Sequence, residues 1–176
     1  MTLEQLYQQV ILDHARSAHG RGLAVLDEDP RSAHAESHQV NPTCGDEVTL
    51  RVTVSRSDTG GDGVVGQVRW DGQGCSISQA SLSVLTDLVT GRSADEAEQL
   101  GETFRALMAS QGKGLDESLE DELGDATAFT GVSQFPARIK CALMSWMAWK
   151  DATTTAQTTS AQSTSTEPVE TMKETK

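Results

Sequence analysis

The sequence predicts an α+β fold in which a small antiparallel sheet packs against several helices. Side chains alternate between apolar and polar in residues 48–54, as in a half-buried strand, and a glycine-rich turn leads to a second apolar run at residues 64–70. On both sides of this hairpin the apolar residues instead recur at helical spacing. The chain of 176 residues is long enough to bury one core, so we expect one main domain.

The first element is expected to be a helix over residues 2–17. Thr2 can cap its N-terminus, with Gln5 three residues later as the partner in a capping box. His14 comes near the end of this helix, where a lone histidine is typical of a cap or a surface group. Residues 18–40 have little periodicity and contain three further histidines, so we expect a loop that lies against the domain.

After the hairpin, apolar spacing predicts a helix over residues 76–90 and a second one that begins after Ser93. The stretch that follows is loop-like, with a short acidic helix expected near residues 116–123. Pro136 stands at the favoured first position of a last helix.

The composition changes after Asp151 to Thr, Ser, Ala, Gln and charged residues, without an aromatic side chain. Such a segment has too little apolar surface to form a core. We therefore expect a domain over residues 1–151 and a disordered tail over residues 152–176.

The formal net charge is −12, which argues against binding to nucleic acid or to an anionic membrane surface, because both require basic patches. The acidic residues are concentrated in residues 95–102 and 116–125. They are interpreted as a solvated face, or alternatively as a docking surface for a basic partner.

No apolar run reaches the length of a membrane span, and the N-terminal segment has the pattern of an amphipathic helix rather than of a signal peptide. The chain has three cysteines, an odd number. These observations predict a cytoplasmic protein whose thiols are ligands or reactive groups rather than disulfides.

The three cysteines are candidates for one site. Cys44 precedes the first strand of the hairpin and Cys75 follows the second, so antiparallel pairing brings both to the same end of the sheet. Cys75 also stands at the start of a helix, where free amides favour a thiolate. Asp46, two residues after Cys44, can point toward the same ion, and Cys141 in the last helix is the third thiol.

Three thiolates and a carboxylate form a ligand set suited to zinc or to the corner of an iron–sulfur cluster, and unsuited to magnesium or calcium. The spacing is not that of a zinc ribbon, because the sequence has no Cys-x-x-Cys pair. The alternative is that the cysteines are unrelated core residues, since free cysteine is commonly buried.

The segments around these cysteines resemble the three cysteine motifs of the NifU-like iron–sulfur scaffold family, which includes IscU and SufU. They are residues 41–46 (Asn-Pro-Thr-Cys-Gly-Asp), 72–78 (Gly-Gln-Gly-Cys-Ser-Ile-Ser) and 138–141 (Arg-Ile-Lys-Cys). The resemblance runs over about residues 2–150 and implies a sheet of about three strands. Two features resemble the SufU branch: Lys140 stands where IscU-type scaffolds carry a histidine ligand, and the segment between the second and third cysteines is long.

The resemblance implies zinc held by Cys44, Asp46, Cys75 and Cys141. It also implies a pyridoxal-phosphate-dependent, SufS-like cysteine desulfurase as partner, which supplies a ligand to zinc and so releases one cysteine to accept persulfide sulfur. Cys44, on a loop, is the expected acceptor, and downstream proteins of the SUF system would receive the sulfur. Arg138 is interpreted either as support for the thiolate or the partner, or as a surface arginine.

Three functions remain open. The first is a zinc-dependent sulfur transfer protein, a relay of the sulfurtransferase type rather than a stand-alone enzyme. The second is a scaffold on which a [2Fe-2S] or [4Fe-4S] cluster is assembled, with iron bound by the same thiols. The third is a binding module with purely structural zinc. The family's first helix commonly leads into an Asn-Pro-Arg-Asn-like stretch, whereas this chain has Ala-Arg-Ser-Ala-His-Gly at residues 15–20. If that stretch contacts the partner, we expect the chain to suit only its own desulfurase.

Overall fold

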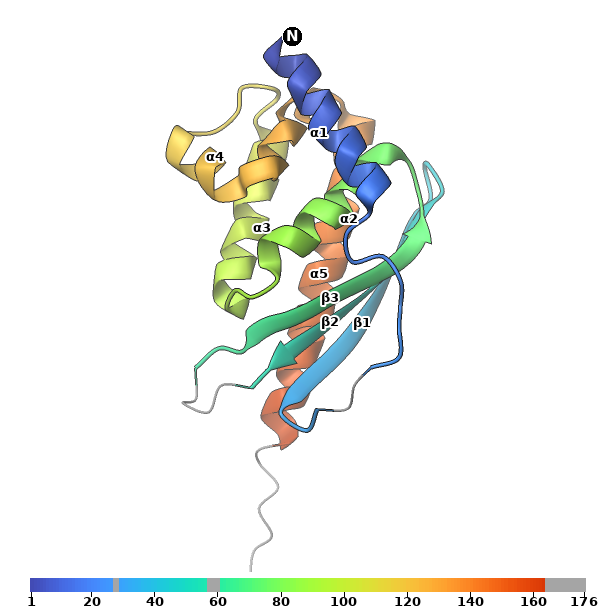
Figure 1. Cartoon of the computed structure of the whole chain (residues 1–176), viewed down its shortest axis with the longest axis vertical. Coiled ribbons are helices and arrows are strands. Elements are labelled where there is room, and N and C mark those ends of the chain that lie inside the picture. The colour runs from blue at the N-terminus through green and yellow to red at the C-terminus, as the bar shows by residue number, and fades with distance from the viewer. Residues whose placement is uncertain (27–28, 57–60, 164–176) are drawn as a thin grey trace, which may run out of the picture.

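The computed structural model describes residues 1–26, 29–56 and 61–163. In this part of the chain one three-stranded sheet is combined with one helix that precedes it in sequence and with helices that follow it (Figure 1). The elements are α1 (Leu3–Ser17), β1 (Ser32–Asn41), β2 (Asp46–Ser55), β3 (Val64–Gln73), α2 (Ser76–Val89), α3 (Ala94–Ala109), α4 (Glu117–Leu123), the 3₁₀ segment η1 (Gly124–Gln134) and α5 (Pro136–Ser163). The predicted α+β class is confirmed.

The sheet is antiparallel with the order β1-β2-β3. Asn41 pairs with Asp46 across the β1–β2 turn, and Glu47 pairs with Gln73 at the end of β3. The β1–β2 turn and the start of α2 therefore meet at one end of the sheet, as the hairpin argument predicted. The turn predicted between the second and third strands includes residues 57–60, which lie outside the described residues.

The prediction of a loop over residues 18–40 is wrong for the part that forms β1. Inward side chains of this strand are small, namely Ala33, Ala35 and Ser37, and they alternate with outward polar ones such as His34 and His38. The two-residue period is present, but its buried positions lack the β-branched residues by which a strand is usually recognised.

The prediction that the chain leaves the domain after residue 151 is also wrong for the next twelve residues, because α5 continues through Ser163. α5 packs along β1 and β2, running behind the sheet in Figure 1. Ala152 and Ala156 are fully buried there. Small side chains let a helix approach closely even where the composition offers little hydrophobicity. Residues 164–176 lie outside the described residues, and a disordered tail there stays a prediction.

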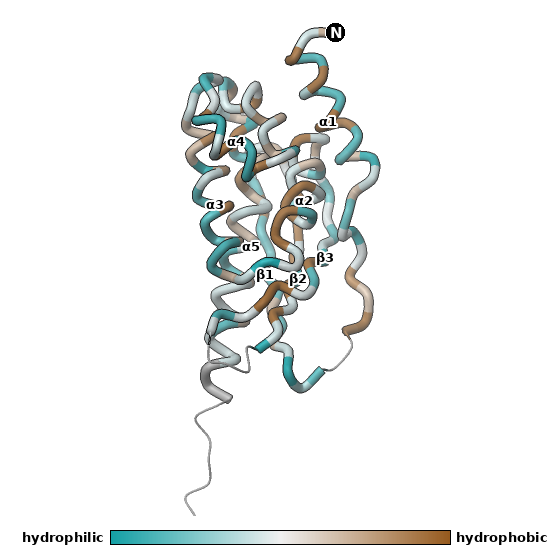
Figure 2. Tube along the Cα trace, turned by 60° about the vertical axis from the view of Figure 1, so that its left-hand side comes forward, coloured by the Kyte–Doolittle hydropathy of each residue, from teal (hydrophilic) through white to brown (hydrophobic). Residues whose placement is uncertain are grey.

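Helix α2 lies at the centre of the helical layer and is strongly hydrophobic (Figure 2). Phe104 stacks on Trp146 at a centroid distance of 5.1 Å and meets Phe129 edge-on at 5.5 Å, which joins α3, η1 and α5. The hydroxyl of Ser81, on α2, donates to the carbonyl of Ala142 on α5 at 2.7 Å. This buried contact fixes α2 against α5, the two helices that carry Cys75 and Cys141.

Candidate metal centre

The β1–β2 turn presents Cys44 and Asp46. Gly45 adopts φ +74°, a left-handed conformation that favours glycine, and its N–H donates to the carbonyl of Asn41 at 2.8 Å. The N–H of Thr43 donates to Asn41 Oδ1 at 3.1 Å, which closes the turn further. Cys44 is consequently exposed at the tip, whereas Asp46, the first residue of β2, is only 4% exposed.

Cys75 is the N-cap residue of α2, as expected from the sequence. Its N–H donates to Asp46 Oδ1 at 3.2 Å, and its Sγ lies 3.7 Å from Asp46 Oδ2. A Cβ on Gly74 would collide with Ser78 Oγ and would lie 3.2 Å from the carboxylate of Asp46. The glycine before the cysteine therefore allows Asp46 to reach the start of α2.

Cys141 supplies the inner wall of the site from α5, where it is 5% exposed. Its Sγ lies 3.6 Å from Cys44 Sγ, so residues 97 positions apart in sequence meet as free thiols. The ligand atoms of Cys44, Asp46 and Cys141 all lie within 4.8 Å of one another. Cys75 is not part of this tight group, but it touches Asp46 and is exposed.

Burial raises the pKa of the Cys141 thiol well above its ordinary value of 9.0. Hydrogen bonds to Asp46 and Cys44, and the negative charges of Cys75 and Asp46, raise this pKa further. In the metal-free chain Cys141 is therefore a neutral thiol at neutral pH. Several groups that can carry negative charge lie close together at this site, and a bound cation would offset their mutual repulsion.

The donor set fits zinc. Three thiols and one carboxylate converge from three segments, and each donor is of a type that zinc accepts in tetrahedral sites. Two of the thiols stand at the exposed rim and one is buried beneath them. The chemistry of the donors thus suits the ligand set that the resemblance implies. The structure groups Cys44, Asp46 and Cys141 tightly, and Cys75 lies beside Asp46.

Arg138 does not reach the thiols. Its guanidinium lies over the ring of Phe135, 5.0 Å from the centroid, in a groove that Tyr7 and Ile77 also line. In the part of the chain that the structure describes, Arg138 makes no hydrogen bond or ion pair with a cysteine. Lys140, the residue before the third cysteine, is exposed.

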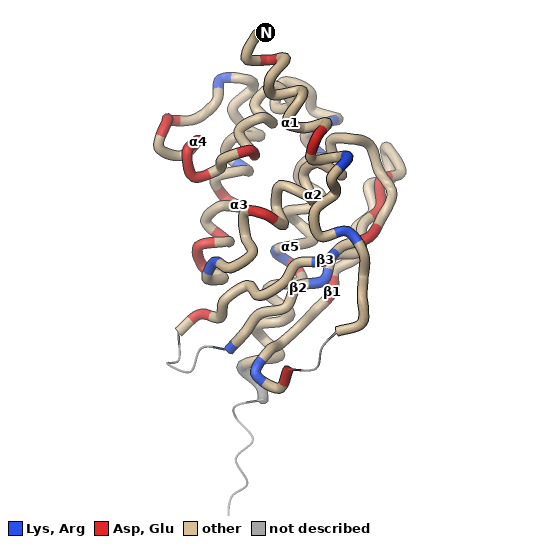
Figure 3. Tube along the Cα trace, in the orientation of Figure 1, with Lys and Arg blue, Asp and Glu red and all other residues tan. Residues whose placement is uncertain are grey.

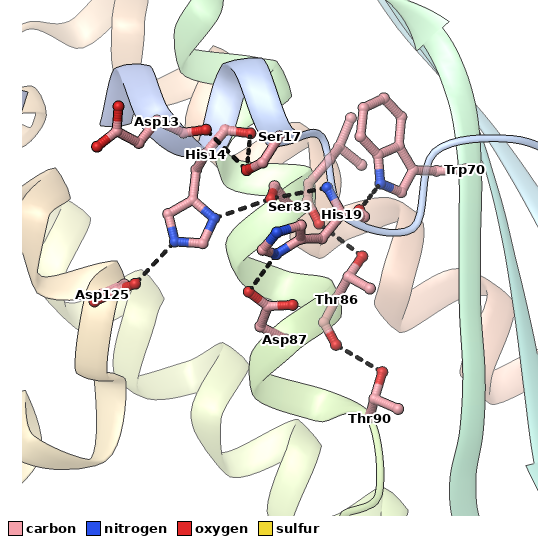
Figure 4. A network of polar contacts seen from close by, with 11 residues as sticks. Asp13, His14, Ser17, His19, Trp70, Ser83, Thr86, Asp87, Thr90 and Asp125 are labelled. Atoms are coloured by element: carbon pink, nitrogen blue, oxygen red, sulfur yellow. Dashed lines mark hydrogen bonds and ion pairs between the residues drawn. The ribbon is translucent and has the colours of Figure 1, made fainter. Parts of the chain in front are cut away.

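Sequence reasoning missed a second polar cluster, drawn in Figure 4. His14, interpreted as a cap or surface group, is instead 7% exposed and packs between α1, α2 and η1. Its neighbours are Ser83 and Asp125, and His19 and Asp87 lie beside it. These partners lie up to 111 positions from His14 in sequence, so no local pattern indicates the cluster.

The described helices include none that is both long enough and apolar enough to cross a membrane. Acidic residues of α3 and α4 lie on the left of Figure 3.

An α+β fold with three converging thiols and a carboxylate at one end of its sheet defines a class of metal- or cluster-handling proteins. The chain belongs to the family of the NifU-like N-terminal domain, whose model matches residues 6–142. The resemblance noted from the cysteine motifs is thereby confirmed, and with it a place among proteins of iron–sulfur cluster assembly.

Relatives carry two kinds of name. The chain is 40% identical to the zinc-dependent sulfurtransferase SufU of Bacillus subtilis (strain 168), over 83% of this chain and 88% of that protein. It is 36% identical to the iron–sulfur cluster assembly scaffold protein IscU of Streptococcus pyogenes serotype M1, over 85% of this chain and 84% of that protein. Among solved structures, a protein from Fervidobacterium islandicum AW-1, described as a candidate iron–sulfur cluster assembly scaffold for the SUF system, superposes with a TM-score of 0.67 at 30% identity. The alignment covers 86% of this chain and 99% of that chain.

Proposed function

We propose that this chain is a zinc-dependent sulfur transfer protein for iron–sulfur cluster assembly, which accepts persulfide sulfur on Cys44. The observation that carries the proposal is the unequal exposure of two adjacent thiols. Cys44 is exposed on a turn, while Cys141, 3.6 Å away, is buried on a helix. A thiol that must react with a partner protein needs to be exposed, as Cys44 is. A thiol that anchors the site is better placed in a helix, as Cys141 is.

The ligands of zinc in this proposal are Cys44, Asp46, Cys75 and Cys141. When bound, zinc would gather the four donors and keep the thiols deprotonated at neutral pH. Asp46 already positions Cys75 through two contacts, and Cys141 is held within α5. The likeness to SufU, named as zinc-dependent, supports this choice of metal.

The sulfur donor we propose is a pyridoxal-phosphate-dependent cysteine desulfurase of the SufS kind, in the reducing cytoplasm. Cys44 would be one of the residues that hold zinc, and the transfer would need it as a free thiolate, because a metal-bound thiolate is a weakened nucleophile. The Cys44 thiolate then attacks the outer sulfur of the partner's persulfide. A new S–S bond forms on Cys44, the S–S bond of the partner breaks, and the partner's cysteine leaves as a thiolate. Downstream SUF proteins would take the sulfur.

Arg138 is better suited to contact with the partner than to support of the thiolate. It is exposed on the first turn of α5, and its guanidinium lies over Phe135 rather than at the thiols. Phe135 itself is 50% exposed, so the pair presents a cationic and apolar surface beside the site.

A second candidate function is a scaffold for a [2Fe-2S] or [4Fe-4S] cluster. The observation that favours it is the open rim of the site, where two thiols are exposed. The likeness to proteins named IscU supports it as well. The exposed Lys140 argues against it, since an ammonium group is not a ligand for iron.

Elemental analysis, acid-labile sulfide and the visible spectrum of the purified chain separate the two functions. About one zinc per chain without colour supports sulfur transfer, because a four-ligand site holds one ion. A brown protein with iron and labile sulfide would favour the scaffold. Zinc content should fall in Cys141→Ser and remain unchanged in Thr43→Ala, a control in the same turn as Cys44.

A further inference from the structure

A second group of potential metal ligands lies at the junction of α1 and α2. We propose that His14, His19 and Asp87 bind a divalent transition metal ion, such as zinc, cobalt or nickel, at a site separate from the thiols. Their ligand atoms all lie within 4.8 Å of one another. Imidazole and carboxylate donors together suit these ions. Asp87 follows Cys75 by twelve residues along α2, about 18 Å at the rise of an α-helix, so the two sites are distinct.

The end of α1 brings the two histidines together. His14 lies in the last turn of the helix, and the C-cap residue Ala18 adopts a left-handed conformation with φ 45°, which turns the chain back toward α2. The N–H of His19 then donates to Ser83 Oγ at 3.1 Å. Asp87 lies one helical turn after Ser83, so it faces the same junction (Figure 4).

The hydrogen bonds of His14 leave one ring nitrogen suited to a metal. Its Nε2 lies 2.9 Å from Asp125 Oδ2, and a carboxylate can only accept, so Nε2 carries the proton. In the neutral imidazole, Nδ1 then holds a lone pair, which accepts from the hydroxyl of Ser83 at 2.9 Å. Histidines that bind metals are commonly oriented in this way, by a carboxylate on the other nitrogen. An ion would take the place of the Ser83 hydroxyl at Nδ1.

His19 and Asp87 form the solvent-exposed side of the site. Their side chains are 47% and 48% exposed, and His19 Nδ1 lies 2.7 Å from Asp87 Oδ2. A tetrahedral ion with bonds of about 2.0–2.1 Å holds its ligands roughly 3.3 Å apart. The His19 and Asp87 ligand atoms, now 2.7 Å apart, would have to separate slightly around the ion, and any wider separation within the group would have to close. The exposed pair can make that movement, while the buried His14 stays in place. Water can complete the coordination from the solvent side.

The competing interpretation is a clamp that joins α1, α2 and η1 by hydrogen bonds and never binds an ion. The two interpretations differ in the stoichiometry of metal binding. We would titrate the intact chain with Co²⁺ by calorimetry and follow the absorption spectrum at the same time. Cobalt on thiolates gives intense sulfur-to-metal charge-transfer bands, whereas a site of imidazoles and a carboxylate does not.

The variants are His19→Ala and Asp87→Ala, because both residues are exposed and their loss should leave the fold intact. His34→Ala, an exposed histidine on β1, is the matched control. We expect the intact chain and the control to bind one more Co²⁺ than either variant, with a dissociation constant in the micromolar range. The charge-transfer bands should be equal in all four proteins.

The proposal is overturned if the intact chain and the two variants bind the same number of ions. It is equally overturned if the additional ion binds only at millimolar concentration, or if His34→Ala removes it. Circular dichroism of each variant confirms that the comparison is made between folded proteins.

Discussion

Replacement of Asp46 should separate the stability of the fold from the affinity for zinc. In Asp46→Asn the side-chain oxygen remains and can still accept the N–H of Cys75, now 3.2 Å from Asp46 Oδ1. The unfolding free energy of the metal-free chain should therefore change by less than about 1 kcal/mol. In Asp46→Ala that acceptor is lost, and we expect a decrease of about 1–3 kcal/mol.

Zinc affinity should respond differently, because both variants lose the negative oxygen ligand. Loss of a residue that merely supports a metal ligand commonly costs about 10–100-fold in affinity. Removal of the ligand itself should cost at least the upper value, about 100-fold, which corresponds to roughly 2.8 kcal/mol. We therefore expect Asp46→Asn to bind zinc far more weakly while it unfolds almost like the parent chain.

The assay is competition for zinc against a chromophoric chelator, combined with urea denaturation of the metal-free proteins. Glu47→Gln is the control, because Glu47 is the adjacent exposed acid and lies beside His38, at 3.1 Å, on the other face of β2. An Asp46→Asn affinity within about threefold of the parent would refute the role of Asp46 as a ligand, since a ligand should cost far more.

Three other predictions address the thiols, the core and the last helix. In the metal-free chain the pKa of the Cys141 thiol is raised, so the folded state keeps this proton to a higher pH than the unfolded state does. The unfolding free energy should therefore fall as the pH rises above about 9. Cys141→Ser should remove that pH dependence, which urea titrations at about pH 8–10 would measure. Ser81→Ala should lower the unfolding free energy by about 1–2 kcal/mol, because it leaves the carbonyl of Ala142 without this buried donor; an unchanged midpoint would show that the α2–α5 contact is dispensable. Ala156→Asp should lower the unfolding free energy by about 2–4 kcal/mol, because it buries a carboxylate against the sheet. Gln157→Asp, at an exposed neighbouring position, should have little effect. Equal effects of the two variants would contradict the packing of α5.

Strong local patterns allowed much of this fold to be predicted from sequence. The capping box of Thr2 and Gln5 is present, the alternation in β2 is real, and Pro136 does begin α5. The meeting of Cys44 and Cys75 at one end of the sheet follows from antiparallel pairing alone.

Elements without a hydrophobic signal could not be predicted. The buried face of β1 consists of small residues, and the last turns of α5 pack through Ala152 and Ala156, so both segments resemble loop or tail in composition. His14 contacts Asp125, more than a hundred residues later, and tertiary contacts of that kind leave no trace in local periodicity.

The role of Cys44 as sulfur acceptor can be tested by locating the transferred sulfur after reaction with the desulfurase. The zinc-loaded chain would be incubated with the partner and free cysteine, alkylated, digested and analysed by mass spectrometry. We expect one additional sulfur atom on the peptide that contains Cys44, and none in Cys44→Ala. Additional sulfur on Cys75 or Cys141, with Cys44 unmodified, would contradict it.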